Sequence, residues 1–512
     1  MKKFGVFAVL FVFVVFNLFL NTFTLSAFPL GEKLEGVLEM MAVDEKDPQS
    51  GQLKNCGIRY FIRTDDGKRH PISLPADAQN LSSDQRVTIS GRWFESDKRN
   101  FIGENLKVLE NTPTSVATDE VHTISNSYLG QQTLNDPESC GPQRTLVAIV
   151  GFTDIPVPTK TSKEAIEDVI FTNPLSTNNF WKECSRGGNR KSKMWLEGEC
   201  LPVVVVLPYP ASYFGYEQDE QNHQLNLLRN AIAYSDDCVD FNQYNRIIFV
   251  RTGEKWARDF STLGKWYIKT QDGYVHISVA FIDEYDIVLD KLNASHEFGH
   301  GLGNGLLHAG SFSVSDKQVY SYGDWWSAMG GLGYGQIGGF QKFPFGWINI
   351  DQVEIIESNN YPQLVWLAQR ELYSKGKKLC IIPLGFDEYG RPVLCSYEYH
   401  RGLGKFDRRL YFFNRNKAVK PNNLILMRKE KIGLNYGSLV YMESDDDCLD
   451  LESKQFCDLE SGVSVQVIQK TGIGKQSKAE LEITKTNPIS PSITLDMIIK
   501  EVIDGIAVNV KA

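Results

Sequence analysis

Two histidines four residues apart, with a glutamate directly after the first, have the types and spacing that could do chemistry. The run reads His296-Glu297-Phe298-Gly299-His300. Positions four apart share one face of a helix, so both imidazoles can point at one metal ion. Neutral imidazole is a good zinc ligand, and zinc lowers the pKa of a bound water to about 7. The carboxylate of Glu297 could take the proton from that water, which is the chemistry of peptide-bond hydrolysis.

The residues around this run predict a helix that ends just after it. Residues 287–292 carry apolar side chains at helical spacing, and Gly303 stands where a helix typically stops and the chain turns back. A turn there would bring His308 to the same ion as a third imidazole. Three histidines with an open fourth position form a catalytic zinc site rather than a closed structural one. We therefore expect His296, His300 and His308 to bind Zn²⁺.

The longer segment around these histidines resembles the zinc motif of the metzincins, specifically the gametolysin-like peptidases. Residues 296–309 read His-Glu-Phe-Gly-His-Gly-Leu-Gly-Asn-Gly-Leu-Leu-His-Ala. In that family the third histidine comes three residues after the glycine that corresponds to Gly303. Here Leu306 takes that position and His308 comes two residues later. The difference fits either a two-residue insertion that loops out or a weaker third ligand.

A second segment downstream resembles the same family. Residues 322–330 read Tyr-Gly-Asp-Trp-Trp-Ser-Ala-Met-Gly, similar to the family's Tyr-Gly-Asp segment that ends in Met-Gly. The resemblance implies that Met329 forms the Met-turn beneath the zinc and supports the ligands by packing. It also implies a secreted metalloprotease, made as a zymogen, that hydrolyses extracellular proteins or glycoproteins with Glu297 as general base.

The start of the chain predicts secretion. Two lysines precede an apolar run from Phe4 to Leu20, and the small pair Ser26-Ala27 follows, which is the order of a signal peptide at 1–27. An uncleaved membrane anchor is the alternative. We expect an extracellular protein without stable membrane insertion after cleavage. The net charge of −9 and the lack of a basic stripe disfavour a nucleic-acid partner.

The 512 residues are too many for a single hydrophobic core, so several domains are expected. Short alternating strands predict an N-terminal β-rich domain at 28–110, which resembles a proregion, and a polar linker follows at 111–139. Mixed strands and helices predict an α+β domain at 140–358, and the resemblance implies that it is a metzincin-like zincin catalytic domain. The strand pattern returns in a C-terminal β-rich domain at 359–512.

The nine cysteines fit an oxidising compartment, and none forms a C-x-x-C pair. Eight lie beyond the expected linker, so up to four disulfides are expected, with Cys380–Cys395 and Cys448–Cys457 as plausible pairs. The odd one, Cys56, would be a latency switch if its thiolate occupied the fourth zinc position. A structural disulfide or a buried thiol is the simpler interpretation of Cys56.

Two other functions stay open from the sequence. One is a catalytically inactive, zinc-containing secreted binding or adhesion protein, which the displaced third histidine supports. Retention of Glu297 speaks against it, because a structural site has no use for a base beside its ligand. The other is a zinc peptidase with two histidines and a distant glutamate, which would leave the Met-turn resemblance unexplained.

Overall fold

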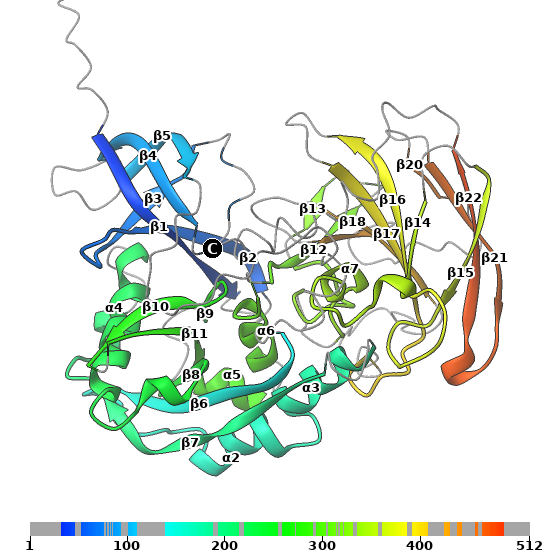
Figure 1. Cartoon of the computed structure of the whole chain (residues 1–512). Coiled ribbons are helices and arrows are strands. Elements are labelled where there is room, and N and C mark those ends of the chain that lie inside the picture. The colour runs from blue at the N-terminus through cyan, green and yellow to red at the C-terminus, as the bar shows by residue number, and fades with distance from the viewer. Residues whose placement is uncertain are drawn as a thin grey trace, which may run out of the picture.

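The computed structural model consists mainly of three β-sheets, of 11, 7 and 4 strands (Figure 1). It describes residues 32–485 except 47–52, 76–77, 79–80, 82, 84, 94–100, 110–138, 188–192, 215–219, 254–258, 272, 290–292, 304–305, 314, 316–317, 321, 331–334, 357–360, 387–391, 408–423, 431–437, 443–455 and 459–462. The expected signal peptide and most of the expected linker lie outside these residues. Within them, no helix is long and apolar enough to cross a membrane.

The N-terminal strands close into a small barrel. They are β1 (Glu32–Lys46), β2 (Leu53–Arg63), β3 (Arg69–Ser73), β4 (Arg86–Trp93) and β5 (Phe101–Val108). The pairing runs β1-β2-β3-β5-β4 and back to β1, with β3 parallel to β5, which is the arrangement of an OB-type barrel. Its interior is filled by apolar residues such as Leu38, Ile62 and Ile89. Strand β1 is 15 residues long and runs on beyond the barrel.

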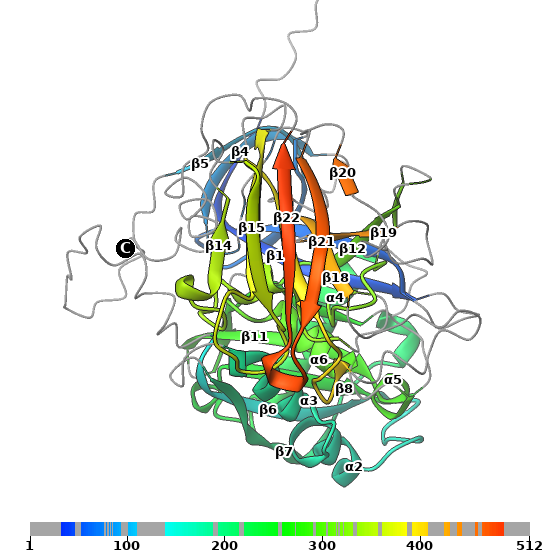
Figure 2. The same cartoon turned by 90° about the vertical axis from the view of Figure 1, so that its right-hand side faces the viewer.

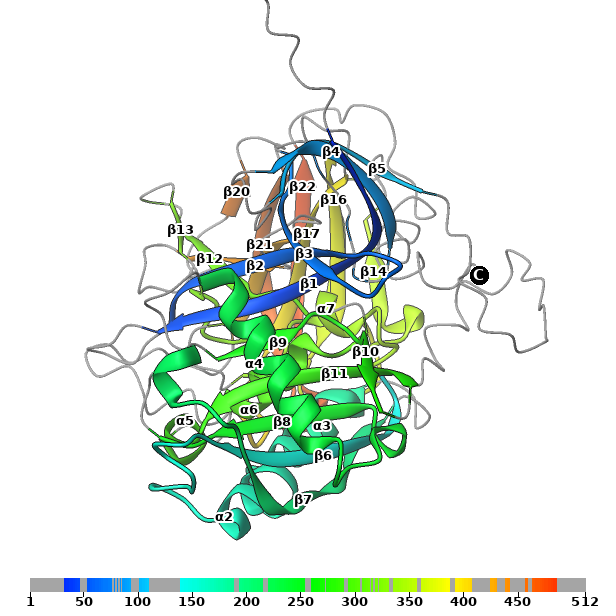
Figure 3. The same cartoon turned by 90° about the vertical axis from the view of Figure 1, so that its left-hand side faces the viewer.

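The second half of the largest sheet carries the helices. Its strands are β6 (Gly141–Gly151), β7 (Met194–Val206), β8 (Arg246–Arg251), β9 (Phe260–Thr262), β10 (Trp266–Thr270) and β11 (Gly273–Asp283). Strands β7, β6, β8 and β11 run parallel, and β9 is antiparallel to β11. Strand β1 pairs with the other side of β9, so the barrel and this sheet are continuous (Figure 3).

Helices cover both faces of this sheet. They are α2 (Lys163–Glu167), α3 (Thr177–Cys184), α4 (Glu220–Ser235), α5 (Glu284–Leu289) and α6 (Asn293–His300). A further helix, α7 (Gly339–Lys342), lies against β17 of the C-terminal half. Successive residues of β6 point to opposite faces, as a strand requires. Val147 and Ile149 pack with Phe298 of α6 in one core. Leu146 and Ala148 pack with α4 in another.

The C-terminal half is a sandwich of the two smaller sheets (Figure 2). One is ordered β13 (Val319–Tyr320), β12 (Ala309–Ser313), β19 (Ser438–Met442), β18 (Leu424–Glu430), β17 (Pro392–His400), β16 (Leu379–Phe386) and β14 (Val353–Ile355). The other is ordered β15 (Gln363–Ala368), β22 (Lys478–Lys485), β21 (Val463–Thr471) and β20 (Phe456–Asp458). Tyr397 and Met427 of the first sheet pack with Val465 and Leu481 of the second.

The expected α+β class is wrong, because the fold is richer in β-structure than that class. Strands make up 48% and helices 21% of the described structure. Helix α4 has 16 residues, and the other α-helices have between 4 and 8. The physical reason lies at β9, whose outer edge pairs with a barrel strand instead of being covered by a helix. The strands interpreted as a separate mixed domain therefore belong to one extended sheet.

The described cysteines do not form the expected pair in the C-terminal half. Cys380 is a free thiol, so the predicted Cys380–Cys395 disulfide is wrong, although the two residues lie on neighbouring strands β16 and β17. Cys448 lies outside the described residues, and its pairing with Cys457 stays a prediction. Burial raises the pKa of the Cys184 thiol to about 12, so this buried cysteine is unreactive.

Candidate metal centre

Helix α6 positions three of the expected residues, and all three are buried. Its first residue, Asn293, donates a side-chain hydrogen bond of 2.6 Å to the carboxylate of Asp259, which fixes where the helix begins. It ends before Gly303, whose φ of 53° is a left-handed conformation that favours glycine. The predicted helix over the motif and its stop signal are therefore confirmed, whereas residues 287–289, expected in the same helix, belong to the separate helix α5.

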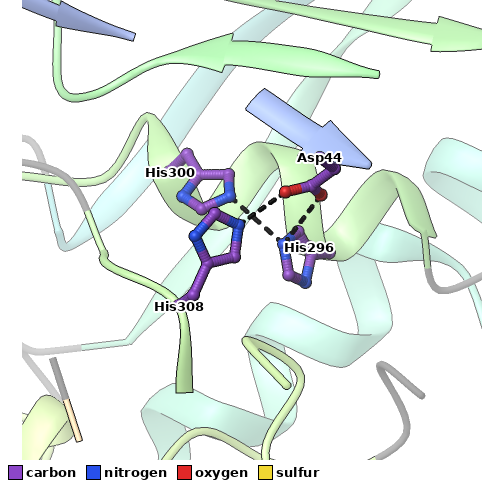
Figure 4. A group of neighbouring side chains, drawn as sticks. All are labelled: Asp44, His296, His300 and His308. Carbon is purple, nitrogen blue, oxygen red and sulfur yellow. Dashed lines mark hydrogen bonds and ion pairs between the residues drawn. The ribbon is translucent and has the colours of Figure 1, made fainter. Parts of the chain in front are cut away.

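Four side chains converge at one point (Figure 4). The Nε2 atoms of His296 and His300 are 3.2 Å apart. His308 reaches them from the loop before β12. Asp44 comes from the end of β1, with Oδ1 2.5 Å from Nε2 of His308 and Oδ2 3.1 Å from Nε2 of His296. The structure thus brings together all three histidines expected from the sequence, and it adds a carboxylate that sequence reasoning missed.

The outer nitrogens of the two helix imidazoles face backbone carbonyls. Nδ1 of His296 lies 2.7 Å from the carbonyl oxygen of Ala328, and Nδ1 of His300 lies 2.6 Å from that of Leu306. A carbonyl only accepts, so Nδ1 carries a proton, and in the neutral imidazole Nε2 then keeps the lone pair. Two lone pairs and a carboxylate oxygen facing one another repel unless a cation lies between them. The buried cluster could therefore hold a metal ion, and its histidines are oriented as metal ligands usually are.

The buried carboxyl group of Glu297 interacts electrostatically with Asp44 of this cluster. Ser261 donates a hydrogen bond of 2.5 Å to Oε2, whereas Oε1 has no hydrogen-bond partner within the described part of the chain. Burial raises the pKa of Glu297 well above its ordinary value, and the neighbouring carboxylates of Asp44 and Asp259 add to the effect. One carboxyl oxygen is thus fixed and the other is available to a reacting group.

The charge states of the other groups follow from burial and proximity. Burial opposes ionisation of Asp44, but the histidines His296 and His308 outweigh it and hold its pKa well below the ordinary value. Burial lowers the pKa of His300, and the neighbouring imidazoles lower it further. An ionised carboxylate beside a neutral imidazole is the donor set that a divalent cation binds.

Met329 lies beneath helix α6, as its predicted role requires. A β-carbon added to Gly299, between the two histidines, would meet Sδ of Met329 at 2.7 Å. The backbone N–H of Ala309 donates to the carbonyl oxygen of Met329 at 2.7 Å, which ties the strand after His308 to the same turn. The sulfur therefore packs against the backbone of the helix and does not enter the cluster of nitrogens.

Tyr322 is a further residue of the site that sequence reasoning missed. Its hydroxyl donates a hydrogen bond of 2.6 Å to Oδ1 of Asp44 and lies 3.2 Å from Nε2 of His308. Its φ of 57° is unusual for a residue with a large side chain, and such strain often marks a functional position. The Tyr-Gly-Asp segment indicated a turn in the sequence. Neither the φ of Tyr322 nor its hydrogen bond to Asp44 could be predicted from that segment.

Asp44 carried no comparable signal. It follows the buried run from Met40 to Val43 near the end of β1, a strand of 15 residues. No metal-ligand spacing links it to the histidines, because 264 residues separate it from His308.

A second group of buried carboxylates lies near the start of α6. It consists of Asp259, Asp283 and Asp286. The guanidinium of Arg251 lies 2.8 Å from carboxylate oxygens of both Asp259 and Asp283, so a protein cation already balances this group. Its evident role is to hold the first turn of the helix in place.

The comparisons with known proteins add no relative: no family model and no curated protein matches the chain.

Proposed function

We propose that this protein is a secreted zinc-dependent endopeptidase that resembles the gametolysin-like metzincins and hydrolyses peptide bonds of extracellular proteins or glycoproteins. One observation carries the proposal. Three imidazoles and Asp44 converge on one point, and the buried carboxyl group of Glu297 interacts electrostatically with Asp44 there. A general base beside a three-histidine site is the arrangement of hydrolytic zinc enzymes.

The donor set favours zinc over other divalent ions. Calcium and magnesium prefer oxygen ligands, whereas imidazole suits zinc. Ligands at 2.0–2.1 Å from one tetrahedral zinc lie about 3.4 Å from one another. The spacing of 3.2 Å between Nε2 of His296 and Nε2 of His300, and of 3.1 Å between His296 and Asp44, is close to this value.

Each residue of the site then has a task. A bound zinc supplies a Lewis acid and a water of lowered pKa. Glu297 takes the proton of the attacking water on Oε1 and passes it to the leaving amine, while the hydrogen bond from Ser261 holds Oε2 in place. The hydroxyl of Tyr322 lies on the side of His308, where it can donate to the developing oxyanion.

A catalytically inactive zinc-binding protein is the second candidate, and one observation favours it. With Asp44 the cluster has four protein ligands, which is the number in a closed structural zinc site. The buried carboxyl of Glu297 favours the peptidase, because keeping an acid in this place has a desolvation cost and serves no purpose at a structural metal.

The test is hydrolysis of a quenched protein substrate by the purified secreted protein, before and after limited proteolysis. We expect activity that a chelator removes and that Glu297→Ala removes with one zinc per chain retained. Glu164→Ala, on the exposed start of α2, is the matched control and should leave the rate unchanged. Zinc at one per chain without hydrolysis in any preparation would favour the binding protein.

A further inference from the structure

Strand β1 leaves the barrel and enters the metal centre. Its residues Met41, Ala42 and Val43 pair antiparallel with Thr262, Ser261 and Phe260 of β9. Hydrogen bonds hold both ends of this contact: Leu263 N–H donates to the carbonyl of Met40 at 2.8 Å, and Asp44 N–H donates to that of Asp259 at 3.1 Å.

The strand that β1 covers is the one nearest the base. Ser261, in the middle of the pairing, is the residue whose hydroxyl binds Glu297. An exposed strand edge binds extended peptides through their backbone, so β9 without β1 would offer such an edge beside the reacting groups. The N-terminal unit thus covers the strand edge that carries the hydrogen-bond partner of Glu297.

Asp44 comes directly after this pairing and lies among the histidines (Figure 4). Its side chain is 1% exposed, and it contacts His308, His296 and Tyr322 within 2.5 to 3.1 Å. A carboxylate so deeply buried is costly unless it is paired or bound to a metal. On a metal held by the three histidines, this carboxylate would take the position that is otherwise open for water.

We propose that the N-terminal barrel is a built-in inhibitor: Asp44 is the fourth metal ligand of the intact chain, and β1 closes the neighbouring strand edge until it is released. The proposal rests on the zinc site of the proposed function. It assigns latency to a carboxylate and not to the thiol of Cys56. The backbone of Cys56 lies opposite Asp44 on β2, one strand farther from β9, and its side chain lies outside the described residues.

The test uses the full-length chain with Asp44→Ala, and Asp44→Asn as a variant that keeps the shape of the side chain. Glu35→Ala and Cys56→Ser are the controls, since Glu35 lies on the barrel part of the same strand and is half exposed. Circular dichroism establishes folding. Three quantities are measured: the absorption spectrum with Co²⁺ in place of zinc, the affinity for a hydroxamate that needs an open metal position, and hydrolysis of a quenched protein substrate.

We expect both Asp44 variants to change the cobalt spectrum and to bind the hydroxamate at least about tenfold more tightly. The reason is that a larger fraction of the molecules then has a metal position open to the hydroxamate. Hydrolysis should rise by a similar factor, and both controls should behave as the parent. An unchanged spectrum and affinity in both Asp44 variants, or release by Cys56→Ser alone, would overturn the proposal. A changed spectrum and affinity without hydrolysis would uphold the ligand and refute the endopeptidase. A parent that binds no metal would overturn both.

Discussion

Nδ1 of His296 lies 2.7 Å from the carbonyl oxygen of Ala328, the residue just before Met329. The first imidazole is therefore oriented by the turn beneath it. That turn is held by the C-terminal sandwich, because Arg370 of the segment after β15 donates to the carbonyl of Trp326 at 2.9 Å. The far half of the chain thus helps to set the geometry of the metal centre.

Arg428 on β18 should be essential for this support. Its Nε lies 2.9 Å from the carboxylate of Asp324, which accepts from the backbone of the turn, and it also contacts Glu398. Arg428→Met leaves two buried carboxylates without this partner, so we expect about 3–5 kcal/mol of lost stability in chemical denaturation. Metal affinity should fall about 10- to 100-fold.

Arg86→Met is the matched control for Arg428→Met, since Arg86 pairs with the exposed carboxylates of Asp65 and Glu35. Exposed ion pairs contribute about 1 kcal/mol or less, so this variant should unfold almost as the parent does. Equal losses in the two variants would show that the buried network does not support the turn.

His308→Ala should remove a metal ligand and with it most of the bound zinc. The variant loses one of three imidazoles, whereas His276→Ala changes a histidine of β11 that stacks on Tyr267 away from the cluster. Zinc content after dialysis against a weak chelator measures the difference. Full retention of zinc in His308→Ala would point to another third ligand.

Tyr322→Phe should lower the rate without loss of metal. The variant removes only the hydroxyl that lies 3.2 Å from Nε2 of His308. Loss of one hydrogen-bond donor to the oxyanion typically lowers kcat by about 10²- to 10³-fold. For Tyr322→Phe we expect a decrease of about 10²-fold in kcat and little change in KM. The comparison is made in the Asp44→Ala background, with the exposed Tyr274→Phe as control. A kcat equal in both variants would assign Tyr322 to holding Asp44 only.

Gly299→Ala should destabilise the protein, although the same change usually stabilises a helix by about 1 kcal/mol. The new β-carbon would lie 2.7 Å from Sδ of Met329 and 3.2 Å from the ring of Trp181, both fully buried. Overpacking of this kind typically costs about 1–3 kcal/mol. Thermal unfolding and zinc affinity measure the effect, and a more stable variant would contradict the close packing of the Met-turn on α6.

Lys378 should make stability rise with pH. Burial, with a smaller effect of Lys342, lowers its pKa to about 7 from an ordinary value of 10.5. Between these values the unfolded chain binds more protons than the folded one, so the free energy of unfolding increases as pH rises through this window. Lys378→Met should lose this contribution, seen as a smaller rise in unfolding free energy between pH 7 and pH 10 than in the parent, whereas the partly exposed Lys377→Met should keep it.

The sequence by itself determined the local part of the site. Helical spacing places His296 and His300 on one face with Glu297 beside them, and Gly303 ends the helix, because these features depend only on backbone geometry within a few turns. The strands of the barrel follow from alternation of apolar residues for the same reason.

Only the tertiary structure decided what completes the site. Asp44 and His308 are 264 residues apart, and Arg428 and Asp324 are 104 residues apart, so no local pattern couples them. These contacts depend on which distant strands pair at their edges. Strand β1 pairs with β9, and β12 pairs with β19. The same edge pairing merged the barrel with the helix-covered sheet and made the fold mainly β. Strand pairing is non-local, which is why the spacing of residues predicted the two histidines on one face of the helix but not the carboxylate that meets them.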